Sequence, residues 1–195
     1  MFDYRRTHNC GALRKEQKGN HVTLSGWVNR RRDHGGLIFI DLRDRFGLTQ
    51  LVFDPEKNPQ AHAIGETLRS EWVISAKGVV SLRQEGMANP KLGTGEIEVY
   101  VDEIEVLSKA KTPPFSVCDE LIEVNEELRL KYRYLDIRRG DIAKKLITRH
   151  RAMITTRQYL DQHGFLEIAT PILGKSTPEG ARDYLVPSRV YPGTL

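Results

Sequence analysis

The sequence has 195 residues, enough for one large or two small domains. Its 39% of hydrophobic residues can form real cores, which excludes a disordered chain. No apolar run approaches the roughly 20 residues that cross a membrane. The first residues lack the apolar segment of a secretory leader. We therefore expect a cytoplasmic protein that does not span a membrane.

Charge is unevenly distributed along the chain, although the net charge is only +4. Residues 129–157 hold ten lysines and arginines against two aspartates, whereas residues 119–127 hold five acidic residues and no base. Such a basic block can bind a phosphate backbone. It can equally be a solvated helix face that pairs with the acidic segment, and charge alone does not separate the two interpretations.

Residue types that carry catalysis or bind metals are scattered. Cys10 and Cys118 form no metal-type pair, so we interpret them as two reduced thiols. The histidines show no ligand spacing. The sequence contains no phosphate-binding glycine loop and no Ser/His/Asp arrangement. We therefore predict no metal site and no catalytic residue in these 195 residues.

Residues 1–108 show the period of two that is typical of β-strands. We expect, in chain order, a short helix at 12–17, a strand from His21, strands at 37–44 and 48–53, a helix at 58–70, and strands at 71–83 and 96–107. Three strands, a helix and two strands predict a five-stranded, partly open OB barrel, in which the helix follows the third strand.

Alternation also predicts which side chains face away from the core. Ile38 and Ile40 take the core face, which leaves Phe39 on the opposite face. Parity on the other strands places Gln50 and Glu98 on the outer face as well. An aromatic ring can stack on a nucleic-acid base, worth about 1–3 kcal/mol, and Gln and Glu can pair with base edges.

Arg32, at the rim, would turn inward under strict alternation, so it can join this face only if a twist or bulge intervenes. The alternative for Phe39 is a second small core under a loop. The alternative for Gln50 and Glu98 is ordinary exposed polarity. Taken together on an OB barrel, these residues favour an interpretation as a base-reading surface.

The C-terminal part follows a break at Pro113-Pro114, which can continue neither helix nor strand. We interpret 109–140 as a hinge or linker. Residues 141–195 begin with a helix from Asp141 to about His163, followed by a strand at 165–168 and a Gly/Pro loop at 174–182. Because these elements cannot close a core, we expect the truncated start of an α+β domain.

Four motifs carry a resemblance over essentially the whole chain: WVNRRRDHGGLIFIDLRDR, LRLKYRYLDIRR, GFLEIATPIL and STPEGARDYLVPSR. In this order they resemble bacterial-type aspartyl-tRNA synthetases of class II. The first three are also similar to the related lysyl and asparaginyl enzymes, whereas the last is highly specific. The resemblance implies an OB anticodon-binding domain, a hinge near the inner elbow of the tRNA, and the start of a class II catalytic domain.

The resemblance implies roles for individual residues. Arg32, Phe39, Gln50 and Glu98 match the anticodon-binding positions, with Phe39 as the stacking aromatic. Glu179 matches a position that contacts L-aspartate in a loop closing over the substrate. From chemistry alone, a flexible surface loop is the favoured interpretation. His34 before the glycines and Gly86 in the loop between the last two strands resemble the non-discriminating type, which charges both tRNA(Asp) and tRNA(Asn). Plain turn residues are the alternative for both.

The activity implied is ATP-dependent aspartylation of tRNA by a homodimer, with ATP and Mg²⁺ bound mostly outside this sequence. The motifs that hold them are absent here, so we expect the 195 residues alone to be inactive. In the non-discriminating type, a separate amidotransferase then converts Asp-tRNA(Asn). The alternatives are an OB module that binds single strands without chemistry, and an asparaginyl or lysyl ligase.

Overall fold

The computed structural model describes residues 5–118, 122–174 and 184–193. The chain divides into two compact units, Met1–Ile142 and Ala143–Leu195. Within the described ranges, no helix has the length and apolar character needed to cross a membrane. Glu179, predicted to contact aspartate, lies outside the described residues.

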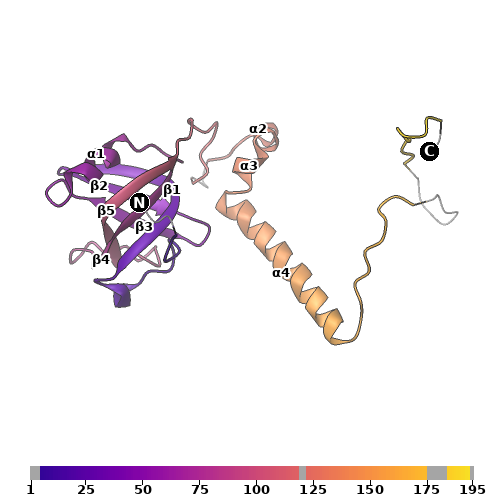
Figure 1. The fold of residues 1–195 in the computed structure, drawn as a ribbon, viewed down its shortest axis with the longest axis horizontal. Helices are drawn as coiled ribbons and strands as arrows, with labels where there is room; N and C mark the ends of the chain where they lie inside the picture. Colours follow the sequence, from indigo (N-terminus) through magenta and orange to yellow (C-terminus); the bar gives the residue numbers. More distant parts are fainter. Residues whose placement is uncertain (1–4, 119–121, 175–183, 194–195) are drawn as a thin grey trace. The chain divides into compact units, whose positions relative to one another are not determined.

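The first unit contains a five-stranded barrel, which confirms the predicted OB architecture (Figure 1). The barrel is closed, however, and not partly open as we expected. Its strands are β1 (His21–His34), β2 (Leu37–Arg43), β3 (Leu48–Phe53), β4 (Val73–Leu82) and β5 (Ile97–Ser108). They follow the order β1-β2-β3-β5-β4, and β4 pairs with β1 to close the barrel. Every pair is antiparallel except β3 with β5.

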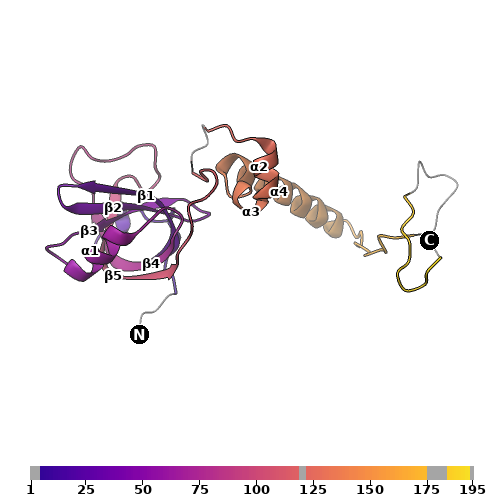
Figure 2. The same ribbon diagram turned by 90° about the horizontal axis from the view of Figure 1, so that it is seen from above.

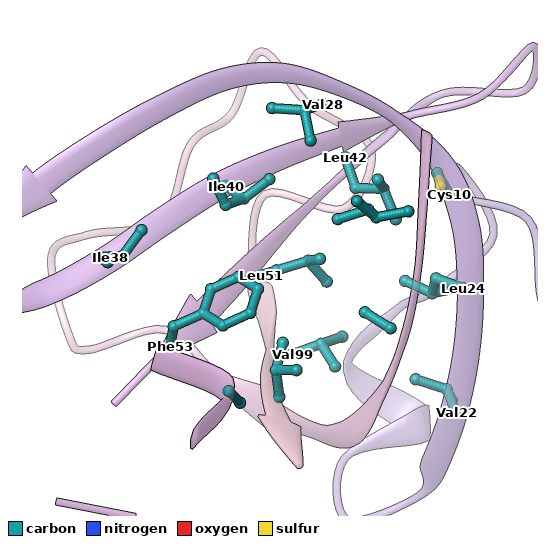
Figure 3. Packing of buried hydrophobic residues seen from close by; sticks show 14 of the residues in the cluster. Cys10, Val22, Leu24, Val28, Ile38, Ile40, Leu42, Leu51, Phe53 and Val99 are labelled. Atoms are coloured by element: carbon teal, nitrogen blue, oxygen red, sulfur yellow. The ribbon is translucent and has the colours of Figure 1, made fainter. Parts of the chain in front are cut away.

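Alternate residues of each strand fill the barrel core, as the period of two predicts. Figure 3 shows their side chains converging from β1, β2, β3 and β5. The best buried include Val22, Leu24, Val28, Ile38, Ile40, Leu42, Leu51, Phe53, Ile74, Ile97 and Val99. The intervening residues of β2 and β3 face outward, and this outer surface carries the candidate site.

Helices of the barrel are shorter than the sequence predicted. A 3₁₀ turn, η1, covers only Lys15–Gln17 of the helix expected at 12–17. The helix α1 (Pro59–Thr67) follows β3 and packs on β2, β3 and β5 (Figure 2). The Asn58 side chain caps it by accepting from the Ala61 N–H at 3.0 Å.

The predicted apolar side of α1 was only partly correct. Ala61 and Leu68 are buried, but Ile64 is 36% exposed and Ala63 is exposed too. Gly65 is buried instead, because its missing side chain lets the helix approach the Phe53 ring. Propensity alone does not reveal which face of so short a helix meets the barrel.

The segment between barrel and second unit contains two short helices that we did not predict, α2 (Glu126–Lys131) and α3 (Arg133–Asp136). A small apolar cluster of Phe115, Val117 and Leu135 packs with Val124, Leu128 and Tyr132. The carboxylate of Asp136 accepts from Arg129 at 2.8 Å and from Arg133, which lowers the pKa of Asp136. The stretch that we interpreted as a linker is therefore packed, with its own small core.

The long helix predicted from Asp141 is present as α4 (Gly140–Gln162). The strand predicted at 165–168 was wrong, because these residues have no regular structure. A strand needs a partner for its N–H and C=O groups, and the described residues after Ile142 contain no other strand. Within this stretch Glu167 pairs with Arg157 at 2.8 Å.

Candidate nucleic-acid interface

A one-residue bulge in β1 places Arg32 on the outer face of the barrel. Val28 is paired with Leu42, and the register then shifts so that Arg30, rather than Asn29, is opposite Asp41. Arg32 is consequently the partner of Phe39. Because side chains of directly opposed residues lie on the same face, Arg32 faces outward beside Phe39. This bulge is the one that strict alternation required.

The outer face carries a continuous network of hydrogen bonds across four strands, β1, β2, β3 and β5. Arg32 donates through Nη2 to Asp41 Oδ1 at 2.6 Å and to Gln50 Oε1 at 3.3 Å. Gln50 donates through Nε2 to Glu98 Oε2 at 2.9 Å. Arg32, Gln50 and Glu98 are therefore brought together although 66 positions separate the first from the last in sequence (98 − 32).

Two aromatic rings belong to the same face. Phe39 is half-buried between Arg32 on β1 and Val52 on β3. Tyr100 is opposite Val52 on β5, and Lys57 Nζ lies 3.6 Å from the centre of its ring. We call the set Arg32, Phe39, Asp41, Gln50, Glu98 and Tyr100 the reader face. It combines stacking surface with hydrogen-bonding groups, the two features with which OB folds bind single strands.

Burial changes the pKa values of two groups on the reader face, Glu98 and Tyr100. Gln50 is 5% and Glu98 6% exposed. Burial raises the pKa of Glu98, and the hydrogen bond from Gln50 and the charge of Arg83 offset part of this rise. Burial also raises the pKa of Tyr100, with a further contribution from the Glu98 carboxylate. Because the Glu98 carboxylate accepts from the Gln50 amide nitrogen, it fixes the orientation of that amide and so determines which of its atoms can bind a ligand.

His34 and Gly86 lie outside this network, the first at the end of β1 and the second in the loop after β4. His34 ends β1 and is exposed, before Gly35 and Gly36 in a turn with positive φ. His62 of α1 contacts the Gly36 carbonyl through Nε2 at 2.9 Å, so the turn is held against α1. Gly86 follows β4 with φ +80°, a conformation that side chains rarely adopt.

The sequence analysis missed four contributors to the region: Asp41, Tyr100, Lys57 and Arg83. Parity placed Asp41 and Tyr100 on the outer face, so the signal for these two was present. Lys57 and Arg83 lie outside strands, where parity gives no information. Arg83 donates through Nε to the Ile97 carbonyl at 3.1 Å, which brings its charge near Glu98.

Two models of known protein families match separate parts of the chain. Residues 22–107 match the family described as the OB-fold nucleic acid binding domain, and residues 125–195 match class II tRNA synthetases (D, K and N). The chain is 79% identical over 195 residues to an aspartate–tRNA(Asp/Asn) ligase of Protochlamydia amoebophila. It is 62% identical over 190 residues to the ligase of that name from Chlamydia trachomatis serovar L2.

The chain covers only part of the length of these relatives. The matches include 100% and 97% of this chain but 33% of each relative, so the chain spans about a third of their length. Among solved structures, asparaginyl-tRNA synthetase from Pyrococcus horikoshii aligns with a TM-score of 0.72 at 25% identity, over 85% of this chain and 36% of that one. Aspartyl-tRNA synthetase from Entamoeba histolytica gives the same TM-score at 19% identity, over 82% and 38%, and shows the fold alone.

Proposed function

We propose that this chain, which belongs to the class II tRNA synthetases of the aspartate, lysine and asparagine group, is the anticodon-binding part of an aspartate–tRNA ligase. The observation that carries the proposal is the reader face. It presents one stacking aromatic, Phe39, beside a linked set of donors and acceptors on the outer surface of an OB barrel.

The roles on the reader face follow from chemistry. Phe39 stacks on an unpaired anticodon base. Arg32 and Gln50 each combine their internal bonds with further N–H groups that can meet base oxygens or phosphates. Glu98 accepts from base amino groups and keeps the Gln50 amide oriented.

The activity we propose for the longer protein is ATP-dependent aspartylation of tRNA in the cytoplasm, by a homodimer. The carboxylate of L-aspartate attacks ATP, pyrophosphate leaves, and the aspartyl group is transferred to the terminal ribose of the tRNA. Neither step needs a protein nucleophile, because positioning and charge stabilisation suffice. Among the described residues no three His, Cys, Asp or Glu side chains group as metal ligands do. We propose that ATP and Mg²⁺ bind mostly outside these 195 residues, and that Glu179 contacts aspartate.

The names of the relatives motivate a further proposal on tRNA choice, namely that both tRNA(Asp) and tRNA(Asn) are accepted. His34 is an exposed hydrogen-bonding side chain two residues beyond Arg32, and Gly86 adds no side chain to the loop between β4 and β5. We propose that this pair relaxes selection between the third anticodon bases, C and U.

A titration with RNA tests the anticodon assignment. The chain is mixed with fluorescent anticodon stem-loops of tRNA(Asp), tRNA(Asn) and tRNA(Phe) at one fixed salt concentration, since phosphate contacts make affinity salt-dependent. We expect the first two to bind at least about tenfold more tightly than the third, the discrimination of one good base contact. Equal binding of all three would support the alternative of a non-specific OB module.

A second assay tests the enzyme assignment. The chain, extended to the length of its relatives, is assayed for pyrophosphate exchange with aspartate, asparagine or lysine. We expect exchange with aspartate alone. Exchange with asparagine or lysine would support the related ligases, and a well-folded protein without exchange would overturn the enzyme assignment.

A further inference from the structure

A second cluster of charged residues surrounds Glu71, at the end of the barrel where the β1 bulge begins. Glu71 is 5% exposed. Arg43 Nη2 donates to its two carboxylate oxygens at 2.8 and 3.0 Å, and Arg138 Nη2 donates to Oε2 at 2.6 Å. The Cys118 thiol donates to Oε1 at 3.5 Å. The carboxylate is therefore saturated with donors and cannot bind a ligand without losing one.

The same arginine reaches the bulged residue. Arg43 Nη1 donates to Asn29 Oδ1 at 2.6 Å, and Asn29 is the residue that the register of β1 skips. Glu71 thus orients a guanidinium that in turn holds the extra residue of β1. Within the β1–β2 pair, the register is regular on both sides of the skipped residue.

The main chain of Glu71 is hydrogen-bonded to Val28, the residue before the bulge. Its N–H donates to the Val28 carbonyl at 2.8 Å, and the Val28 N–H donates to the Trp72 carbonyl at 2.8 Å. Glu71 has φ +65° and is the one non-glycine residue with positive φ in the described part of the chain. Such a conformation is strained and persists where the surroundings impose it. In this conformation the main chain of Glu71 bonds to Val28, and its side chain bonds to Arg43, which bonds to Asn29.

We propose that Glu71 and Arg43 are positioning residues for base reading, because they hold the bulge that puts Arg32 on the reader face. A slip of one residue transfers every following side chain to the opposite face. Without the bulge, Arg31 would replace Arg32 beside Phe39, and Arg32 would turn toward the core. This inference rests on the proposed function, since it concerns how strongly the reader face binds an anticodon.

A double-mutant cycle tests the inference in the whole chain. Glu71→Gln keeps the side-chain volume but removes the charge that orients Arg43, and Asn29→Ala removes only the amide that Arg43 holds. We expect each to weaken binding of the tRNA(Asp) anticodon stem-loop by at least about fivefold. In an Arg32→Ala background we expect each to change affinity less than about twofold, since residues that act through one another do not add.

Controls separate positioning from general stability. Arg138→Gln removes another donor to Glu71 but leaves the contact between Arg43 and Asn29, so we expect affinity within about twofold of the unaltered chain. Thermal unfolding checks that each variant is folded, and Asn29→Ala keeps the test available if Glu71→Gln does not fold.

Three outcomes would overturn the inference. Single variants may bind as the unaltered chain does, or they may lose the same factor in the Arg32→Ala background, which would indicate a general effect on the fold. If the unaltered chain does not bind the stem-loop at all, the proposed function fails and this inference with it. The first two outcomes leave the proposed function intact, so the failures are distinguishable.

Discussion

The barrel carries two networks of charged side chains that differ in the exposure of their arginines and in how many acceptor positions are occupied. On the reader face the Arg32 side chain is 42% exposed, and a single nitrogen, Nη2, makes both of its hydrogen bonds to the described residues. Around Glu71 the carboxylate is 5% exposed and accepts from two arginines and a thiol. The Arg32 guanidinium therefore keeps N–H donors available to a ligand, whereas the acceptor positions of the Glu71 carboxylate are occupied by donors of the protein.

This difference separates binding from stability. A saturated, buried ion cluster cannot lose one member without leaving the others unpaired in a poorly solvated site. An exposed ion pair, such as that of Arg32 with Asp41, contributes little to stability, because water solvates each group when its partner is removed. We therefore expect changes around Glu71 to act first on folding and changes on the reader face to act first on RNA affinity.

Removal of the Glu71 carboxylate should give the largest effect. In Glu71→Ala the guanidinium groups of Arg43 and Arg138 lose their shared partner, so we expect about 3–5 kcal/mol less unfolding free energy. Arg32→Ala should cost less than about 1 kcal/mol. Urea unfolding followed by tryptophan fluorescence measures both. Similar losses in the two variants would contradict the distinction between the networks.

Truncation of the stacking ring should act on binding and not on the Glu71 cluster. We expect Phe39→Ala to weaken binding of the anticodon stem-loop by about 1–3 kcal/mol, the value of one base stacked on an aromatic ring. Phe46→Ala is the matched control, because Phe46 is 51% exposed in the turn between β2 and β3. An unchanged affinity in Phe39→Ala would remove this ring from the reader face.

The reader face was predictable because it depends on local alternation. Parity separated Phe39 from Ile38 and Ile40, and it placed Gln50 outside the core. It also showed that Arg32 needed a bulge. The cause of that bulge was not predictable, since Glu71 and Arg43 are 28 residues apart in sequence and meet only after β4 pairs with β1.

Elsewhere, the errors arose where tertiary contacts decide local structure. The short helices α2 and α3 depend on the small cluster around Leu135, which no periodicity reveals. The residues 165–168 have the composition of a strand, but composition cannot supply a pairing partner. The network of Glu98 with Gln50 required the parallel pairing of β3 with β5, two strands that are not consecutive in sequence.

Lowering the pH should weaken the binding of RNA to the reader face before it unfolds the barrel. Burial raises the pKa of Glu98, so this carboxylate takes up a proton at a higher pH than an exposed glutamate does. Protonation removes the charged acceptor that orients Gln50, and we expect stem-loop affinity to fall about fivefold, the value of about one hydrogen bond. Glu98→Gln should show the weaker affinity at neutral pH and no such pH dependence.

The stability effect of Glu98 has the opposite sign. Because its pKa is higher in the folded than in the unfolded chain, its contribution to stability is largest below the unfolded pKa and falls as the pH rises through the folded pKa. Glu98→Gln should therefore unfold at neutral pH with an equal or larger free energy than the unaltered chain. A clear loss of stability would mean that Glu98 belongs with Glu71 among the structural groups.

The smallest effect concerns the choice between tRNAs at the edge of the reader face. His34→Leu removes an exposed hydrogen-bonding group two residues beyond Arg32. We expect the ratio of affinities for the tRNA(Asp) and tRNA(Asn) stem-loops to shift about two- to fivefold toward tRNA(Asp), the value of one neutral hydrogen bond. His21→Leu, the same change at the opposite end of β1, should leave the ratio unchanged. If both variants shift the ratio equally, the effect comes from the strand as a whole and His34 has no special part in tRNA choice.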